Sequence, residues 1–226
     1  VTGVTSSTAN GTYGTGSVIS IQVTFSGNVT VTGTPTLALN SGGSASYVSG
    51  SGTSILNFDY TVAAGQNTAD LDYTSTSALT GTIDTAVLTL PAPGTAGSLG
   101  ANKAIVIDTT APTLTTTSPA DNTTNIALNA NIVFTFNEAV QAGTGTLRLV
   151  NQASGAITLI NVTDTSQVTF SGNTMTVNPT ANLLANTAYE LRMPTAGTVK
   201  DLAGNNFATL SNPINLPPKP FTATPR

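Results

Sequence analysis

The sequence predicts an all-β protein built from two tandem β-sandwich domains. Short runs of β-branched and apolar residues recur along the whole chain, as in VISIQVTF at 18–25 and NIVFTF at 131–136. Clusters of Gly, Asn, Ser and Pro separate these runs at intervals of roughly 8 to 12 residues, a spacing typical of sandwiches and barrels. Convincing helical patterns are absent from the sequence, which favours the same class.

The predicted strands follow in chain order, because each is an alternating or β-branched run that fits a pleated, half-buried surface. In the first half they cover 18–25, 35–40, 54–62, 86–90 and 103–108. In the second half they cover 131–136, 145–150, 156–162, 166–170, 174–179 and 188–193. The segment TANLLANTAYEL, at 180–191, carries Asn and Thr where a helix favours Ala, Glu or Lys. We expect it to form one short turn before a strand.

The strongest domain boundary is the segment IDTTAPTLTTTSP, which begins at residue 107. Pro112 cannot donate to a ladder and biases its predecessor to extended geometry, so the chain leaves one sheet and enters the next without a flexible gap. The predicted domains are therefore 1–110 and 111–216. The Pro-rich segment 217–226 is expected to be a linker to a further repeat, or an arm that docks on a neighbouring copy through Phe221.

The hexapeptide VTFSGN occurs twice, at 23–28 and 168–173. The copies lie 145 residues apart (168 minus 23), whereas pairing Phe25 with Phe136 gives a domain repeat of 111 (136 minus 25). The two hexapeptides are therefore not equivalent positions. The second copy is expected to form a hairpin, in which Gly172 and Asn173 supply the positive φ of a tight turn. The recurring feature is expected to be a strand, a Ser-Gly-Asn turn and a second strand.

The composition excludes several classes of function. Charged residues make up 7% of the chain, the net charge is −4, and the six basic residues are scattered, so no footprint for nucleic acid is present. The absence of Cys and His removes disulfides, thiol nucleophiles, imidazole bases and the usual zinc sites. No apolar run is long enough to insert into a membrane. The segment is expected to be a mature or excised fragment.

Several phrases resemble repeats of bacterial surface proteins. In the first half, NGTYGTGSVISIQVTFSGNVTVTGTPTLAL and TADLDY resemble the Ig-like repeats of large bacterial surface proteins and adhesins. In the second half, PTLTTTSPADNTTNIALNANIVFTFNEAVQAGTGTLRLV and VKDLAGNNF resemble the bacterial Ig-like domain of S-layer and other surface proteins. The junction DTTAP is similar to the connector between such repeats. The resemblance implies two tandem Ig-like β-sandwich domains in an extracellular protein and no catalytic residues.

The resemblance also suggests a candidate cation site at the junction. In an Ig-like sandwich the incoming linker, the end of the second strand and the last hairpin loop lie at one end, which would gather Asp108, Glu138, Asp201 and Asn205. Ca²⁺ prefers six to eight oxygen ligands from carboxylates, amides and carbonyls, and it would stiffen the joint. The alternative is that Asp201 and Asn205 cap a turn, while Glu138 is solvated or paired with Lys200.

A second acidic pair lies in the phrase DLDY. On a strand, Asp70 and Asp72 would share one face, where two carboxylates could bind a cation or serve a glycosidase. The alternative is a charged outer face whose alternate residues, Leu71 and Tyr73, pack inward. No Trp and few aromatic residues are present for a sugar-binding platform.

These observations predict a non-catalytic structural unit of a bacterial extracellular surface protein, such as a stalk, filament or surface-layer segment. Its expected partners are other copies of itself or neighbouring Ig-like repeats. The alternative is an adhesive module that binds a glycan or a host-surface ligand through loops at one end of a sandwich. An enzyme is not expected, because the sequence offers few titratable groups and no cluster of them with aromatic walls.

Overall fold

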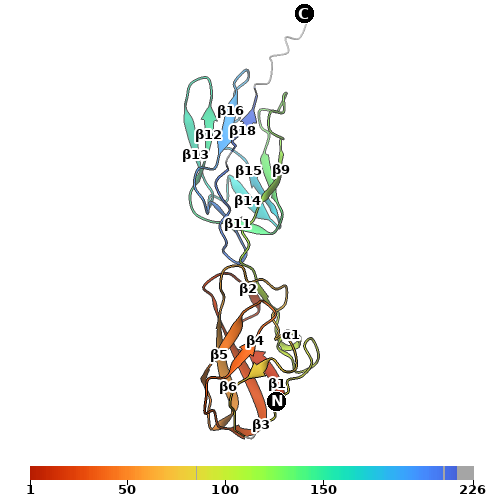
Figure 1. Ribbon diagram of the computed structural model, residues 1–226. Helices are drawn as coiled ribbons and strands as arrows, with labels where there is room; N and C mark the ends of the chain where they lie inside the picture. The colour runs from red at the N-terminus through yellow and green to blue at the C-terminus, as the bar shows by residue number, and fades with distance from the viewer. Residues whose placement is uncertain (85, 211, 218–226) are drawn as a thin grey trace, which may run out of the picture. The chain divides into compact units, whose positions relative to one another are not determined.

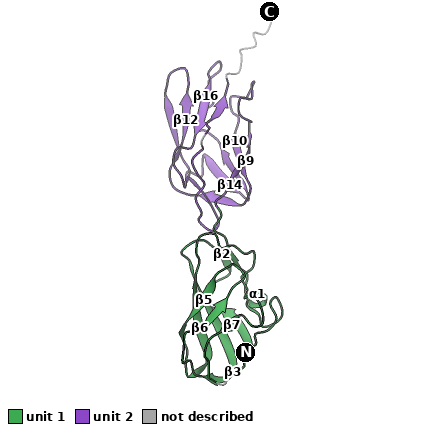
Figure 2. Cartoon of the chain, viewed as in Figure 1, with its two compact units in different colours: residues 1–110 green, residues 111–226 purple. Residues whose placement is uncertain are grey.

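The computed structural model describes residues 1–84, 86–210 and 212–217. The chain divides into two compact units, unit 1 at Val1–Thr110 and unit 2 at Ala111–Arg226 (Figure 2). Each unit has its own cluster of buried apolar side chains. Apart from one short helix, the regular structure described in both units consists of strands (Figure 1), which confirms the all-β class.

Unit 1 contains one large antiparallel sheet and one small parallel pair. Its strands are β1 (Gly3–Ser6), β2 (Gly11–Tyr13), β3 (Val18–Val29), β4 (Thr36–Ala38), β5 (Ser44–Ser49), β6 (Thr53–Thr61), β7 (Leu79–Thr80) and β8 (Ile105–Ile107). The six-stranded sheet has the order β1-β3-β6-β5-β4-β7, and β2 pairs with β8 separately. The long strands β3 and β6 form the centre of the large sheet.

The centre of unit 1 follows from the period of two along its strands. Ile19, Ile21 and Val23 of β3 are fully buried, while the residues between them are more exposed. Phe58 of β6 and Ile105 of β8 join the same core cluster. The apolar face of the large sheet is therefore covered partly by the β2–β8 pair, whose parallel register the sequence did not predict.

Two predictions for unit 1 were wrong. Residues 86–90 form no strand; Ala86, Leu88 and Leu90 pack against the core and Val87 is 71% exposed, but the run has no ladder partner among the described residues. A helix, α1 (Leu99–Asn102), is present where none was expected. The Ser98 hydroxyl caps it by accepting a hydrogen bond from Ala101 N at 3.2 Å, and four residues are too few to show a helical period.

Unit 2 contains two four-stranded antiparallel sheets and one two-stranded sheet. Its strands are β9 (Leu114–Ser118), β10 (Ile132–Phe136), β11 (Val140–Ala142), β12 (Thr146–Asn151), β13 (Ile157–Asn161), β14 (Val168–Ser171), β15 (Thr174–Val177), β16 (Tyr189–Arg192), β17 (Val199–Asp201) and β18 (Ile214–Leu216). The sheet orders are β14-β15-β10-β9, β13-β12-β16-β18 and β11-β17. The two larger sheets form the layers of a sandwich (Figure 1).

The core of unit 2 is filled from both layers. Phe134 and Met175 come from one sheet, Leu149 and Leu191 from the other, and all four are at most 4% exposed. The predicted turn within 180–191 is confirmed, because residues 185–186 form a turn before β16. Pro217 is described, whereas the rest of the predicted arm at 217–226 lies outside the described residues.

The two VTFSGN copies have different structures. The second forms the predicted hairpin between β14 and β15, with Gly172 at φ +54°, whereas Asn173 does not have the expected positive φ. The first lies inside β3, which shifts register between Thr24 and Val29 and continues as a strand. The prediction of a shared Ser-Gly-Asn turn was therefore wrong, because in β3 the same residues pass through a register shift beside β6.

Candidate functional site

The candidate cation ligands Glu138 and Asp201 meet at the β11–β17 pair of unit 2. Val140, at the start of β11, is paired with Asp201, the last residue of β17. Glu138 lies two residues before β11, in the bend between β10 and β11, which brings it to the same end of the pair. The carboxylates of Glu138 and Asp201 each have an oxygen within 4.8 Å of the other.

Asp201 is also the centre of the loop that follows β17. Its carboxylate oxygens accept hydrogen bonds from Asn205 N at 2.8 Å and Asn205 Nδ2 at 2.7 Å. Its main-chain N donates to Asn205 O at 3.1 Å, and Gly204, at φ +91°, turns the chain back. The turn-capping role considered for Asp201 and Asn205 is therefore present. Asp201 is 1% exposed, so this cap satisfies a buried carboxylate.

The same geometry is compatible with a divalent cation. A Ca²⁺ ion bound to two oxygens at about 2.3 to 2.6 Å needs those oxygens no more than about 5.2 Å apart, and the pair meets this condition. Glu138 is half-buried, and its Oε1 accepts a hydrogen bond from Asn137 Nδ2 at 3.3 Å. The turn cap and a cation site are thus not exclusive, because two hydrogen bonds leave lone pairs on the carboxylate of Asp201.

Asp108, the third predicted carboxylate ligand, lies in unit 1, three residues before unit 2 begins. Its Oδ1 accepts a hydrogen bond from Thr110 N at 2.9 Å, and its own N donates to Tyr13 O at 3.0 Å. These bonds anchor the end of unit 1 to β2. A joint role with Glu138 and Asp201 stays a prediction.

The acidic pair Asp70 and Asp72 does not lie on a strand face, so the prediction of an outward pair was wrong. Asp72 is only 6% exposed, and its carboxylate accepts hydrogen bonds from Tyr73 N and Gly94 N, both at 2.9 Å. Leu71 and Tyr73 are buried, as expected. Partial burial raises the pKa of Asp70, and the charge of Asp72 adds to this effect. The DLDY segment therefore anchors loops of unit 1 through Asp72.

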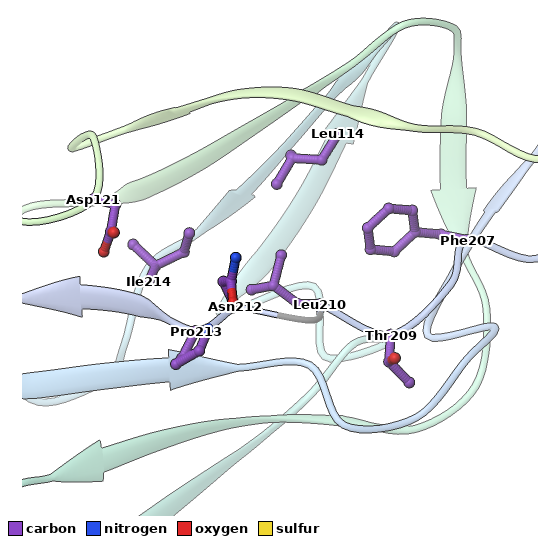
Figure 3. A pocket seen from close by; sticks show the side chains of 8 residues that line it. All are labelled: Leu114, Asp121, Phe207, Thr209, Leu210, Asn212, Pro213 and Ile214. Atoms are coloured by element: carbon purple, nitrogen blue, oxygen red, sulfur yellow. The ribbon is translucent and has the colours of Figure 1, made fainter.

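A hollow of about 370 Å³ opens between β9 and β18 in unit 2 (Figure 3). Leu114, Leu210 and Ile214 contribute apolar side chains to its lining. The titratable side chain among its described lining residues is Asp121, whose Oδ1 accepts from Asn215 N at 2.7 Å and Nδ2 at 3.0 Å. These bonds join the loop after β9 to β18, and the described lining offers no pairing of a nucleophile with a base.

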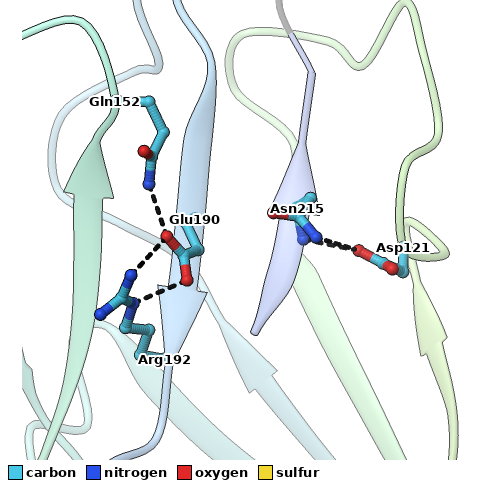
Figure 4. A network of polar contacts seen from close by, with 5 residues as sticks. All are labelled: Asp121, Gln152, Glu190, Arg192 and Asn215. Atoms are coloured by element: carbon cyan, nitrogen blue, oxygen red, sulfur yellow. Dashed lines mark hydrogen bonds and ion pairs between the residues drawn. The ribbon is translucent and has the colours of Figure 1, made fainter. Parts of the chain in front are cut away.

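Sequence reasoning missed a polar network on the outer face of the β12–β16 sheet (Figure 4). Arg192 donates from Nε to Glu190 Oε1 at 2.6 Å and from Nη2 to Oε2 at 2.8 Å, and Gln152 also donates to Oε2. The spacing of Glu190 and Arg192, on one face of a strand, is the signal that could have indicated it. The hydrogen bonds from Arg192, more than its charge, lower the pKa of Glu190.

This network predicts a pH dependence. Because the folded pKa of Glu190 lies below its ordinary value, the ion pair stabilises unit 2 above that value, and this stability is lost as the pH falls through the folded pKa. We expect Glu190→Gln to reduce the loss of stability between neutral pH and pH near 3, by a modest amount because Arg192 is half exposed. Urea denaturation of both proteins at both pH values measures this loss in the free energy of unfolding. The pKa of Asp164 is also lowered, but Asp164 is present in both proteins and contributes equally to both losses. Equal losses in wild type and Glu190→Gln would contradict the prediction.

Comparison with known proteins bears on unit 2. Residues 108–218 match the family model of the bacterial Ig-like domain. A search of curated proteins found no match. Bacterial Ig-like domains occur in surface proteins and are generally non-catalytic. Among the described residues, no helix has the length and apolar character needed to cross a membrane. The match spans the strands of all three sheets of unit 2, so residues 108–218 are similar to the bacterial Ig-like domain.

Proposed function

We propose that the chain is a structural unit of a bacterial extracellular surface protein, in which the two units act as spacer and assembly modules. The observation that carries the proposal is the bacterial Ig-like domain at residues 108–218, since such domains occur in surface proteins. The low content of charged residues supports it, because a surface of Thr, Ser, Asn and Gly has little charge repulsion to oppose contact with a neighbour. No catalytic role is assigned to any residue.

The proposal is tested against the adhesive alternative. A structural unit is expected to associate with other copies of itself, so its average mass in sedimentation equilibrium should rise with concentration without any added ligand. An adhesive module should stay monomeric and bind immobilised glycans or host-cell surfaces in a saturable way. Monomeric behaviour at all concentrations, together with saturable glycan binding that is lost on loop mutation, would replace the structural proposal with the adhesive one.

Calcium binding is part of the proposal. Glu138 and Asp201 are the expected ligands, with Asn205 as a further oxygen donor, and the separation of the two carboxylates supports the assignment. Two carboxylates close together repel one another, so a cation that binds only the folded state would stabilise it.

We expect Ca²⁺ to raise the melting temperature of the chelated protein. At about 100 times the dissociation constant the gain is about 2.7 kcal/mol. Glu138→Gln should abolish this gain, because it removes one anionic ligand while Asp201 keeps its bonds to Asn205. Asp164→Asn, which removes a partly exposed carboxylate elsewhere in unit 2, should leave the response to Ca²⁺ intact. An equal response to Ca²⁺ in wild type and Glu138→Gln would reject this site.

A further inference from the structure

The strand β13 forms a free edge in unit 2. It is the outer strand of the sheet β13-β12-β16-β18 in the described part of the chain. On its inner side, Asn151 N donates to Ala156 O at 2.8 Å and Val162 N donates to Gly145 O at 3.2 Å. Antiparallel pairs alternate between bonded and non-bonded positions, so the main-chain groups of Ile157, Leu159 and Asn161 point away from β12. They form a row of donors and acceptors along the edge.

The side chains of this edge are apolar and exposed. Ile157 is 54% exposed and Leu159 is 60% exposed, both on the outer face of the sheet, while Ile160 is fully buried on the inner face. The segment AITLIN, at 156–161, contains no charge, no Pro and no Gly. Such six-residue segments of high β-propensity and low charge are those that pair with other strands. The strand is therefore suited to a further partner strand.

The other edges of the two four-stranded sheets are protected, which sets β13 apart. The edge strand β9 is flanked by Pro112 and Pro119, and β18 is flanked by Pro213 and Pro217. Proline and coverage by another segment are ordinary means of blocking an edge. The edge strand β14 is followed by a turn that β11 covers, because Val140 N donates to Gly172 O at 2.9 Å. No charge, proline or register shift protects β13.

We propose that β13 pairs antiparallel with β13 of a second copy of this chain, which joins two four-stranded sheets into one of eight strands. The inference rests on the proposed assembly function and names the surface that performs it. With a two-fold axis at Thr158, Ile157 of each copy lies opposite Leu159 of the other copy. Both of these pairs are hydrogen-bonded positions, so they exchange about four main-chain hydrogen bonds. Apolar side chains then face apolar side chains, with no charge in either strand.

A second copy fits this edge because the segment is complementary to itself. Antiparallel pairing of identical strands is an isologous contact, which closes at two copies. The pairing satisfies exposed main-chain groups and partly covers four exposed aliphatic side chains, two from each copy. The contact is small compared with a stable dimer interface, so the association is expected to be weak and to depend on concentration.

The first test compares two leucines of the full-length chain by sedimentation equilibrium over a wide concentration range. Leu159→Lys places a charge at the pairing surface, and we expect it to weaken association at least about tenfold. Leu184→Lys is the matched control, because Leu184 is 59% exposed but lies outside β13, and it should associate like wild type. Thermal melting should show that both variants are folded.

The second test uses the absence of cysteine from the chain. Thr158→Cys places one thiol at the two-fold axis, where a non-bonded antiparallel pair separates the Cα atoms by about 4.5 Å, within the range of a disulfide. Mild oxidation should yield a covalent dimer in high yield. Thr116→Cys, at the centre of the proline-flanked edge strand β9, is the control and should cross-link only at a low background rate.

The outcomes separate the two proposals. If wild type associates, but Leu159→Lys associates equally and Thr158→Cys cross-links no faster than Thr116→Cys, the pairing at β13 is wrong while the assembly function stands. If wild type stays monomeric at every concentration and Thr158→Cys fails to cross-link, both the pairing and the assembly function are wrong. Loss of association in Leu159→Lys alone, with efficient cross-linking of Thr158→Cys, establishes the inference.

Discussion

Replacing Gly143 by alanine is expected to destabilise unit 2 more than any exposed substitution. An added Cβ would lie 1.8 Å from Gly197 O, which is a main-chain atom and cannot rotate away. The same contact carries two hydrogen bonds, from Gly143 N to Thr198 O and from Thr144 N to Gly197 O, both at 2.9 Å. The clash and the loss of these bonds together should cost about 3 to 5 kcal/mol.

The measurement is urea denaturation of the full chain, followed through the NMR signals of unit 2. The matched control is Gly155→Ala, which also replaces a glycine in unit 2 but meets open space. Gly155 has φ +72°, so its substitution should cost about 1 to 2 kcal/mol from backbone strain alone. Equal midpoints for the two variants would show that the segments at 143 and 197 separate at little cost, contrary to the prediction.

The packing at Gly143 also explains how the candidate site is supported. Residues 143–144 and 197–198 hold the far end of the β11–β17 pair, and Asp201 lies at its near end. A shift at Gly143 would therefore move the strand that presents Asp201. We expect the response to Ca²⁺ to be weaker in Gly143→Ala than in wild type, even under conditions in which the variant remains folded.

The sequence predicted the strands of unit 2 well, because their patterns are long and regular. The run 131–136 alternates buried and partly exposed residues in the structure as it does in hydropathy. By contrast, the three-residue strands β11, β17 and β18 carry too few residues to show a period, and no prediction was made for them. Their pairing is decided by the tertiary contacts of unit 2.

The candidate site shows a similar limit. The phrase KDLAGN predicted that Asp201 and Asn205 would interact, because Asp followed by Gly and Asn is local turn chemistry. The burial of Asp72 could not be predicted in this way, since its partner Gly94 lies 22 residues further along the chain. The Glu190–Arg192 pair was visible as two charges on one strand face, yet its network also includes Gln152, from the turn after β12.

The second large effect is expected for Phe134→Ala in the core of unit 2. Phe134 is 0% exposed at the centre of β10, where its strand neighbours are Met175 on β15 and Thr117 on β9. Removing the ring leaves a cavity between the layers, which should cost about 3 to 5 kcal/mol. Phe170→Ala, on the edge strand β14 where the ring is only partly buried, should cost about 1 to 2 kcal/mol. The same urea experiment measures both, and equal losses would contradict the position of Phe134 in the core.

Phe134→Ala also separates stability from assembly. The folded fraction of this variant keeps β13 and its exposed side chains, so it should associate with the affinity of wild type when the unfolded fraction is taken into account. Leu159→Lys should behave in the opposite way, with a melting temperature near wild type and weakened association. If instead association followed stability in both variants, the contact would arise from partly unfolded molecules, and the ordered edge of β13 would not be its cause.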